Sequence, residues 1–287
     1  MSTKRSSLSL VQLAEEQSAT NAFFPAAERP LIEEFLKNGI VTIDVENKAA
    51  LDRMQQFLAE TAASLLKLPK PADAEAFLNA AHRHVSVEEL NSFRLTIISA
   101  MKKETWYREA YYSLAANALA TLVGNELAMQ RGVNLSIQLP DDTSSLLPLH
   151  SDVWSGDSPY EVVLWVPYVS CYKTKSMYFC NAEADERVQS KLAELKDKTA
   201  DDLYNHIAAD APFMDVPYGK AMIFTQNIMH GNRVNIEPET RWSSNCRFKS
   251  VLSPYADKKL GEFFEPITLR PTTRLGLRYQ LPTGFKE

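Results

Sequence analysis

Apolar residues change their spacing near residue 125, from the three- and four-residue period of helices to the alternation of strands. Before that point, four stretches show an apolar face at helical spacing: residues 30–36, 48–67, 87–103 and 106–123. One short strand is expected among them at 40–45, a β-branched run that follows Gly39, where a glycine can end a helix. We therefore expect residues 1–125 to form a mainly helical layer with one early strand.

Strand patterns dominate residues 126–287. Residues 134–139 alternate strictly between polar and apolar side chains, and four further segments are rich in strand-forming residues: 162–166, 177–180, 221–224 and 241–250. A charged segment at about 183–208 predicts a helical insertion between them. Neither a glycine-rich nucleotide motif nor a strand–helix alternation follows residue 125, which argues against a doubly wound parallel sheet. The pattern predicts one α+β domain over 1–287, with an antiparallel jelly-roll core and helices outside it.

The composition is that of an ordinary globular protein, with 45% apolar and 23% charged residues. Its formal net charge is −5 and no long basic stripe is present, which argues against nucleic acid as a partner. Three cysteines without C-x-x-C spacing suggest neither a disulfide framework nor a cysteine zinc site. No segment approaches the roughly 18 apolar residues of a membrane span, and the N-terminal stretch lacks a signal peptide's apolar core. We expect a cytoplasmic protein that does not cross a membrane.

Histidines are few, so metal-binding candidates can be enumerated. They stand at positions 82, 84, 150, 206 and 230. In His150-Ser151-Asp152, an extended backbone would direct the first and third side chains to the same face, where they can share one ion. Such a pair is common by chance. His230 follows the expected strand 221–224 and could supply a second imidazole from a neighbouring strand. Two histidines and one carboxylate would hold one face of a metal and leave three positions open, as in non-haem iron oxygenases.

Arg241 lies eleven residues after His230, at the start of an alternating stretch. Alternation places four polar side chains on one face of this strand: Arg241, Ser243, Asn245 and Arg247. An arginine directed into a barrel near a metal calls for a ligand carboxylate. The alternative for Arg241 is a surface ion pair with the acidic loop before it, at Glu237 or Glu239.

With these residues in place, the sequence resembles the Fe(II)/2-oxoglutarate dioxygenase superfamily. The superfamily pattern is H-x-D, then a distal histidine, then an arginine roughly ten residues later, and it is matched by His150, Asp152, His230 and Arg241. The tripeptide His230-Gly231-Asn232 and the helix–glycine–strand unit around 35–45 are similar to the phytanoyl-CoA-dioxygenase-like branch. The resemblance therefore covers most of the chain. More narrowly, the segments 147–167 and 241–266 look similar to a bacterial group of these oxygenases found with carbohydrate-biosynthesis clusters.

The resemblance implies a double-stranded β-helix core of cupin-like type. It also implies Fe(II) held by His150, Asp152 and His230, and 2-oxoglutarate as co-substrate, with Arg241 and the nearby hydroxyl of Ser243 at its distal carboxylate. Such an enzyme would use O2 to hydroxylate a small-molecule substrate and release succinate and CO2. A sugar or sugar-derived acid is favoured by the narrower resemblance. Desaturation, cyclisation and epimerisation use the same kind of metal site and stay open.

Four residues are candidate substrate contacts. Gln138 lies on the strand before the metal ligands, Trp154 and Tyr160 lie in the glycine-containing segment after them, and Arg247 shares a face with Arg241. The alternative for the two aromatic residues is a place in the core, and for Arg247 it is a structural ion pair.

A competing metal site would use His82 and His84 with Glu88, which match the cupin spacing H-x-H-x-x-x-E. Its surroundings are helical, so ordinary surface or loop histidines are favoured there. Two functional alternatives remain beside the 2-oxoglutarate oxygenase. One is a cupin-type metal enzyme that needs no 2-oxoglutarate, and the other is a non-catalytic binding or sensor module on the same barrel. A homodimer also stays open.

Overall fold

The computed structural model describes residues 23–195 and 197–284. Its centre is a seven-stranded antiparallel sheet in the order β1-β6-β4-β8-β2-β9, with β3 also paired to β8. The strands are β1 (Ile40–Asp44), β2 (Leu127–Gln130), β3 (Asn134–Gln138), β4 (Glu161–Pro167), β6 (Lys220–Thr225), β8 (Arg241–Ser250) and β9 (Phe264–Pro266). A smaller sheet faces it, formed by β5 (Tyr178–Phe179) and β7 (His230–Gly231).

The strand β8 organises the larger sheet because it pairs along both edges. One edge runs beside β4, while the other meets β3 near its start and β2 near its end. Every residue of β4 is buried, which explains why its sequence is an almost continuous apolar run. The predicted strands 134–139, 162–166, 177–180, 221–224 and 241–250 all coincide with observed strands.

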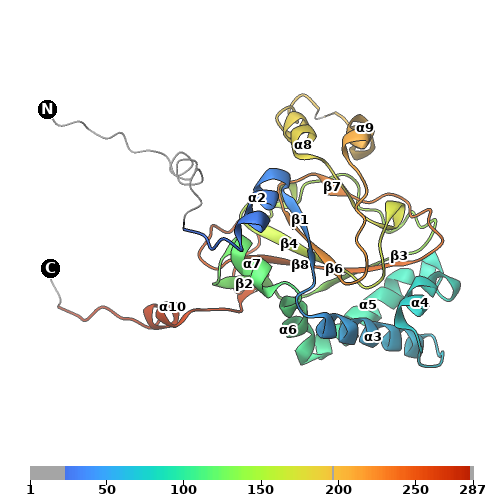
Figure 1. The fold of residues 1–287 in the computed structure, drawn as a ribbon, viewed down its shortest axis with the longest axis horizontal. Helices are drawn as coiled ribbons and strands as arrows, with labels where there is room; N and C mark the ends of the chain where they lie inside the picture. The colour runs from blue at the N-terminus through green and yellow to red at the C-terminus, as the bar shows by residue number, and fades with distance from the viewer. Residues whose placement is uncertain (1–22, 196, 285–287) are drawn as a thin grey trace.

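Helices from the first half of the chain cover one side of this sheet (Figure 1). They are α2 (Arg29–Asn38), α3 (Lys48–Leu65), α4 (Ala74–Asn79), α5 (Val87–Lys103), α6 (Thr105–Ser113) and α7 (Ala116–Val123). Two buried aromatic side chains join the layers: the Trp242 indole donates to the Leu78 carbonyl of α4, and the Tyr111 hydroxyl of α6 donates to the Leu164 carbonyl of β4. The helical layer and the early strand are as expected from the sequence.

The single helix expected over 106–123 is wrong, because the chain leaves helical geometry at Ala115, between α6 and α7. Glu46, which lies before α3, accounts for the break. Its backbone N–H donates to the Leu114 carbonyl, and its carboxylate accepts from the backbone N–H groups of Asn117 and Ala118. A distant glutamate therefore caps the start of α7, a contact that local sequence patterns do not reveal.

The predicted insertion forms two short helices in place of one continuous segment. These are α8 (Ala182–Gln189) and α9 (Ala200–Ile207), which lie beyond β7 at the opposite end of the barrel from α3 (Figure 1). They pack with the smaller sheet around a second apolar cluster that includes Leu149, Tyr178 and Met229. Short 3-10 turns occupy four connections: η1 (Ala81–Arg83), η2 (Asp152–Ser155), η3 (Lys173–Lys175) and η4 (Ala208–Asp210).

After β9, the chain leaves the barrel and continues through α10 (Pro271–Gly276), which projects away from the other elements (Figure 1). The three cysteines, Cys171, Cys180 and Cys246, are buried and free, as expected. Within the described residues, every helix is too short or too polar to cross a bilayer.

Candidate active site

The residues His150, Asp152 and His230 meet at the mouth of the space between the two sheets. Their ligand-type atoms all lie within 4.8 Å of one another, and within the described ranges no other group of histidine, cysteine and acidic side chains is so arranged. Two backbone hydrogen bonds link His150 with His230, at N···O distances of 3.0 and 2.8 Å, and their ring centroids are 4.5 Å apart. Asp152 begins the turn η2. The sequence-predicted triad is therefore assembled in space.

Both imidazoles are held in one tautomer by the backbone. The Nδ1 of His150 lies 2.8 Å from the Pro148 carbonyl oxygen, and the Nδ1 of His230 lies 2.9 Å from that of Ile228. A carbonyl oxygen only accepts hydrogen bonds, so each Nδ1 carries the proton. The Nε2 atoms are left with free lone pairs, and both face Asp152, at 3.6 Å from His150 and 3.9 Å from His230. Hydrogen bonds of this kind, from the ring nitrogen that faces away from the metal, orient metal-binding histidines.

Charge states at the site also suit a metal. Burial by itself would raise the pKa of Asp152, but the neighbouring His150, His230 and Arg247 side chains lower it to about 2. Burial, with the neighbouring His150, lowers the pKa of His230 to about 4. At neutral pH the site thus offers an ionised carboxylate and a neutral buried imidazole, the forms that bind metal ions. This donor set fits Fe(II) and leaves coordination positions open.

A cavity of about 200 Å³ extends from the triad into the barrel. One part of its wall is apolar: Leu147, Val163, Trp165, Met177 and Phe224. The remainder is polar: Asn134, Ser136, His150, Asp152, His230, Asn232, Arg241, Asn245 and Arg247. The alternation predicted for β8 therefore places Arg241, Asn245 and Arg247 in the cavity wall, while Trp242 belongs to the core.

Among the charged side chains that line the cavity, Arg241 is the most buried, with 2% of its surface exposed. Its Nη2 donates to the Ser136 hydroxyl at 3.2 Å, whereas its Nε and Nη1 have no hydrogen-bond partner, and no ion pair to it occurs in the described part of the chain. Burial lowers its pKa to about 10, which leaves it charged. An unpaired buried guanidinium is costly and fits a ligand carboxylate. The surface ion pair considered as an alternative is not formed; Glu239 pairs with Lys175 instead.

Four other residues expected at the site, Ser243, Gln138, Trp154 and Tyr160, lie outside the cavity wall. Ser243 is buried with an unpartnered hydroxyl, yet it does not line the cavity, and Ser136 on the facing strand takes the place beside Arg241. The amide of Gln138 is occupied by the Arg233 carbonyl and Asn232, also outside the cavity wall. Trp154 and Tyr160 are 40% and 55% exposed, so neither is a core aromatic, and neither borders the cavity.

Arg247 lines the cavity but its guanidinium is already engaged. Its Nη2 lies 3.1 Å from Oδ1 of Asp152, and its Nε lies 3.0 Å from Oδ1 of Asp157. Asp157 is buried and also pairs with Lys258. The metal-site carboxylate is thus the inner end of a chain of alternating charges that leads to the surface. Sequence spacing gave no indication of Lys258, since it lies 101 residues from Asp157.

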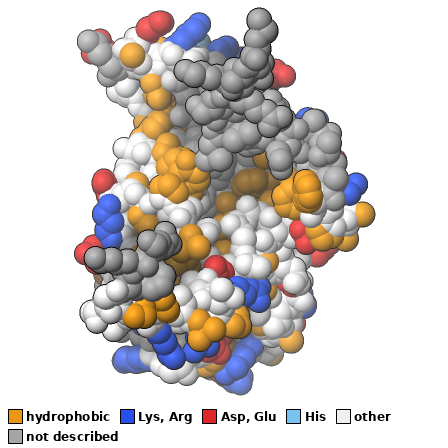
Figure 2. Space-filling model, turned by 90° about the vertical axis from the view of Figure 1, so that its left-hand side faces the viewer, with side chains coloured by type: hydrophobic (Ala, Val, Ile, Leu, Met, Phe, Trp, Pro, Cys, Tyr) orange, Lys and Arg blue, Asp and Glu red, His pale blue; other side chains and the backbone are white. Residues whose placement is uncertain are grey.

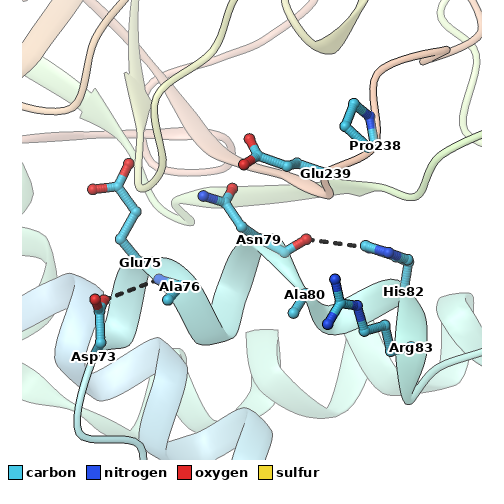
Figure 3. Close-up of a pocket in the computed structure, with 9 residues that line it drawn as sticks. All are labelled: Asp73, Glu75, Ala76, Asn79, Ala80, His82, Arg83, Pro238 and Glu239. Carbon is cyan, nitrogen blue, oxygen red and sulfur yellow. Dashed lines mark hydrogen bonds between the residues drawn. The ribbon is translucent and has the colours of Figure 1, made fainter.

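The competing histidines lie on the other side of β8, in a different environment. His82 belongs to η1, and its Nδ1 approaches the Asn79 carbonyl and the Thr240 hydroxyl. It borders a separate open pocket of about 550 Å³ between α4 and the loop at Glu239 (Figure 3). His84 stacks on Phe77. The metal-capable group found in the described residues does not include these histidines, so the cupin-spaced alternative has no geometric support.

Solved structures share this architecture. The nickel complex of the non-heme monooxygenase ThoJ superposes with a TM-score of 0.52 at 17% identity, over 85% of each chain. Its apo form gives 0.52 at 16% identity, over 84% of this chain and 85% of that one. The chain has the fold of this monooxygenase. The predicted α+β fold, with a double-stranded β-helix and N-terminal helices, is thereby confirmed.

Another similar structure is the non-heme alpha-ketoglutarate-dependent epimerase SnoN from nogalamycin biosynthesis. Its TM-score is 0.47 at 14% identity, over 92% of this chain and 93% of that one. No family model matches the sequence, and no curated protein matches it significantly. At these identities the likeness establishes a common fold, and the reaction has to be argued from the site.

Proposed function

We propose that this protein is an Fe(II)- and 2-oxoglutarate-dependent oxygenase that hydroxylates a small polar metabolite. The observation that carries the proposal is the unpaired guanidinium of Arg241 in the same cavity as His150, Asp152 and His230. The triad alone would suit many metal enzymes. A buried arginine with two free donor atoms in addition calls for a dianionic co-substrate that reaches from the metal to the arginine.

Each site residue has a definable task in this reaction. The Nε2 atoms of His150 and His230 and the carboxylate of Asp152 would hold the iron, which supplies the oxidising chemistry when bound. Arg241 and the Ser136 hydroxyl would bind the distal carboxylate of 2-oxoglutarate. Ser243, which the resemblance places in this role, is the register partner of Ser136 across the β3–β8 pair and would contribute only after a rearrangement of its hydroxyl.

Arg247 is better suited to positioning than to substrate binding. Its contact with one oxygen of Asp152 leaves the other oxygen for the metal, and its contact with Asp157 fixes the direction of the guanidinium. The apolar side of the cavity, formed by residues such as Phe224 and Val163, would exclude water from the reacting atoms.

The substrate side faces the mouth of the cavity. His150 retains 27% of its side-chain surface, and Trp154 and Tyr160 stand on the exposed segment that follows the ligands. The amides of Asn134 and Asn245 line the cavity and offer hydrogen bonds to a small polar molecule, whereas the two aromatic residues lie outside the cavity wall. A sugar or sugar-derived acid is compatible with this lining, and Gln138 would reach it only if its present hydrogen bonds were broken.

The proposal can be tested without knowledge of the substrate. Protein reconstituted with Fe(II) should convert 2-oxoglutarate to succinate slowly under air. Calorimetry should show 2-oxoglutarate binding to the Co(II)-loaded protein. Asp152→Ala should abolish Co(II) binding, and Arg241→Met should retain Co(II) and lose 2-oxoglutarate. His82→Ala serves as the control and should change neither.

Two other outcomes would overturn the proposal. Tight Co(II) binding with no affinity for 2-oxoglutarate would indicate a metal enzyme of the cupin type that uses no co-substrate. Absence of metal binding in the unaltered protein would indicate a non-catalytic binding module. Both are distinguished from a folding failure by the circular dichroism spectrum and the melting temperature of each variant.

A further inference from the structure

Residues 268–284 form an arm that leaves the barrel and contacts it only at its base. Glu126 holds this base: its carboxylate accepts hydrogen bonds from the backbone N–H of Arg270 at 2.7 Å and from the Thr273 hydroxyl at 2.9 Å. Beyond this base, the hydrogen bonds of residues 274–284 stay within the arm, and within the described residues no hydrogen bond or ion pair joins them to the chain before residue 268. In Figure 1 the arm extends outward past α10.

Large apolar side chains are displayed along this arm. Leu275, Leu277, Tyr279 and Leu281 are each between 67% and 72% exposed. Leu275 belongs to α10, Leu277 and Tyr279 follow in the hydrogen-bonded turn at its end, and Leu281 lies just beyond it. Single exposed leucines are ordinary, but a run of four on a projecting segment is the kind of apolar patch that marks an interaction site.

We propose that this arm docks on a second copy of the same chain, so that two copies exchange arms in a symmetric dimer. The proposal concerns assembly and does not depend on the metal chemistry. Exchange of identical segments is a common route to a closed two-fold assembly, because each copy gives one arm and receives one.

Charge favours a second copy over other partners. The arm carries Arg270, Arg274 and Arg278 and no acidic residue between 268 and 284. The whole chain has a formal charge of −5, so the remainder carries −8 once these three arginines are set aside. A basic arm is therefore attracted to the acidic body of another copy. The same acidic body would be repelled by an anionic membrane or by nucleic acid.

The available area is also sufficient. A side chain of this size exposed to this degree presents roughly 100–150 Å², so four of them present about 500 Å² per arm. Two exchanged arms and the surfaces that they cover would remove about 2,000 Å² from water, which is at the upper end of a standard stable interface. One arm docked alone would give about half of that.

Large apolar side chains are also exposed near the start of the described chain. Leu36 on α2 is 72% exposed, and Phe23, just before α2, is 85% exposed. Figure 2 shows hydrophobic side chains gathered at several places on the left-hand side of the molecule in Figure 1. In a two-fold arrangement the arm of one copy reaches the side of its partner that bears the partner's own arm, so these residues are available to receive it.

The experiment compares the full chain with Leu277→Ser/Leu281→Ser by light scattering coupled to size exclusion, over a range of protein concentrations. The unaltered chain should be a dimer, and the double variant should dissociate at least 100-fold more readily with an unchanged circular dichroism spectrum. Leu252→Ser is the matched control, because Leu252 is 74% exposed but lies outside the arm; it should remain dimeric. High salt should weaken the wild-type dimer.

Three results would overturn the proposal. A wild-type chain that is still monomeric at about 100 µM, a concentration at which any dimer with a Kd of roughly 1 µM would be mostly assembled, would mean that the arm has no second copy as its partner. A dimer unaffected by the arm variants would place the interface elsewhere. Binding of a monomeric wild-type chain to vesicles of phosphatidylglycerol, lost in the double variant, would assign the arm to a membrane surface.

Discussion

Replacing Arg241 by methionine should change stability in opposite directions with and without 2-oxoglutarate. Methionine has a similar length and no charge, so it fills the space of the arginine stem while removing two buried donor atoms that lack partners. An unsatisfied buried polar group costs about 1–3 kcal/mol. The ligand-free variant should therefore be more stable than the unaltered protein by about that amount.

In a protein of this length, a stabilisation of about 1–3 kcal/mol corresponds to a rise of roughly 2–6 °C in melting temperature. The unaltered protein, loaded with Co(II) and given 2-oxoglutarate at about 1,000 times its Kd, should gain about 4.1 kcal/mol from binding. The variant should show no such gain, since it has lost the group that pairs with the distal carboxylate. The order of the two melting temperatures should then be reversed by the ligand.

Thermal unfolding followed by fluorescence, with Co(II) in place of iron to prevent turnover, measures both effects. Arg187→Met is a suitable control, because Arg187 forms an exposed ion pair with Asp210 and such pairs contribute little. The reasoning about Arg241 is refuted if the variant retains the 2-oxoglutarate-dependent shift. It is also refuted if the ligand-free variant melts several degrees lower, because the guanidinium would then have a structural partner.

Three further predictions concern the surroundings of the metal site. Asp157→Ala should lower the free energy of unfolding in urea by about 3–5 kcal/mol, because Arg247 loses a buried partner. Asp201→Ala, which removes a partner from an exposed ion pair, is the control and should cost under about 1 kcal/mol. Equal effects of the two substitutions would contradict the role of the buried ion pairs. Burial and then the charge of Asp157 raise the pKa of Glu161 from its usual 4.5 to about 7. The folded state thus binds that proton more tightly, and the protein loses stability as pH rises from about 4.5 to 7. In denaturation curves, the stability of Glu161→Gln relative to the unaltered protein should therefore be greater at pH 8 than at pH 5, by up to about 3 kcal/mol. A difference between the two proteins that does not change with pH would argue against this role of Glu161. Gly231→Ala would place a Cβ 2.5 Å from the Tyr178 hydroxyl and 2.8 Å from the Leu147 carbonyl oxygen, so the backbone beside His230 must shift and Co(II) binding should weaken. Gly132→Ala, whose Cβ meets nothing within 4 Å, is the control. A Co(II) affinity unchanged in both variants would show that the metal site tolerates this shift of the backbone.

Periodicity predicted most of the fold because the layers are segregated along the chain. Helical spacing identified α3 and α5, and alternation identified β3 and β8, whose two faces meet the cavity and the core. The short strands β2 and β9 were not predicted. At four and three residues they are too brief for a periodic signal, and they are strands because β2 pairs with the end of β8 and β9 pairs in turn with β2.

The metal ligands could be predicted from spacing because few histidines are present and the chemistry of the donor set is restrictive. The expected geometry was only partly right: His150 forms an isolated bridge with His230, and Asp152 begins a 3-10 turn in place of a continuous strand. Contacts that distant segments of the chain make with the site residues could not be predicted from the sequence. Ser136 approaches Arg241 from a neighbouring strand, and Lys258 reaches Asp157 from a loop near the end of the chain.

The backbone bridge between His150 and His230 has a consequence for the life of the protein without metal. Two segments 80 positions apart are fastened by main-chain hydrogen bonds, so the imidazoles are held side by side without help from an ion. Chelation should therefore leave a folded apoprotein that reloads on simple addition of metal, unlike small zinc domains, which unfold when their ion is removed. A cell could keep such a protein in reserve through a period of iron scarcity and recover it without new synthesis.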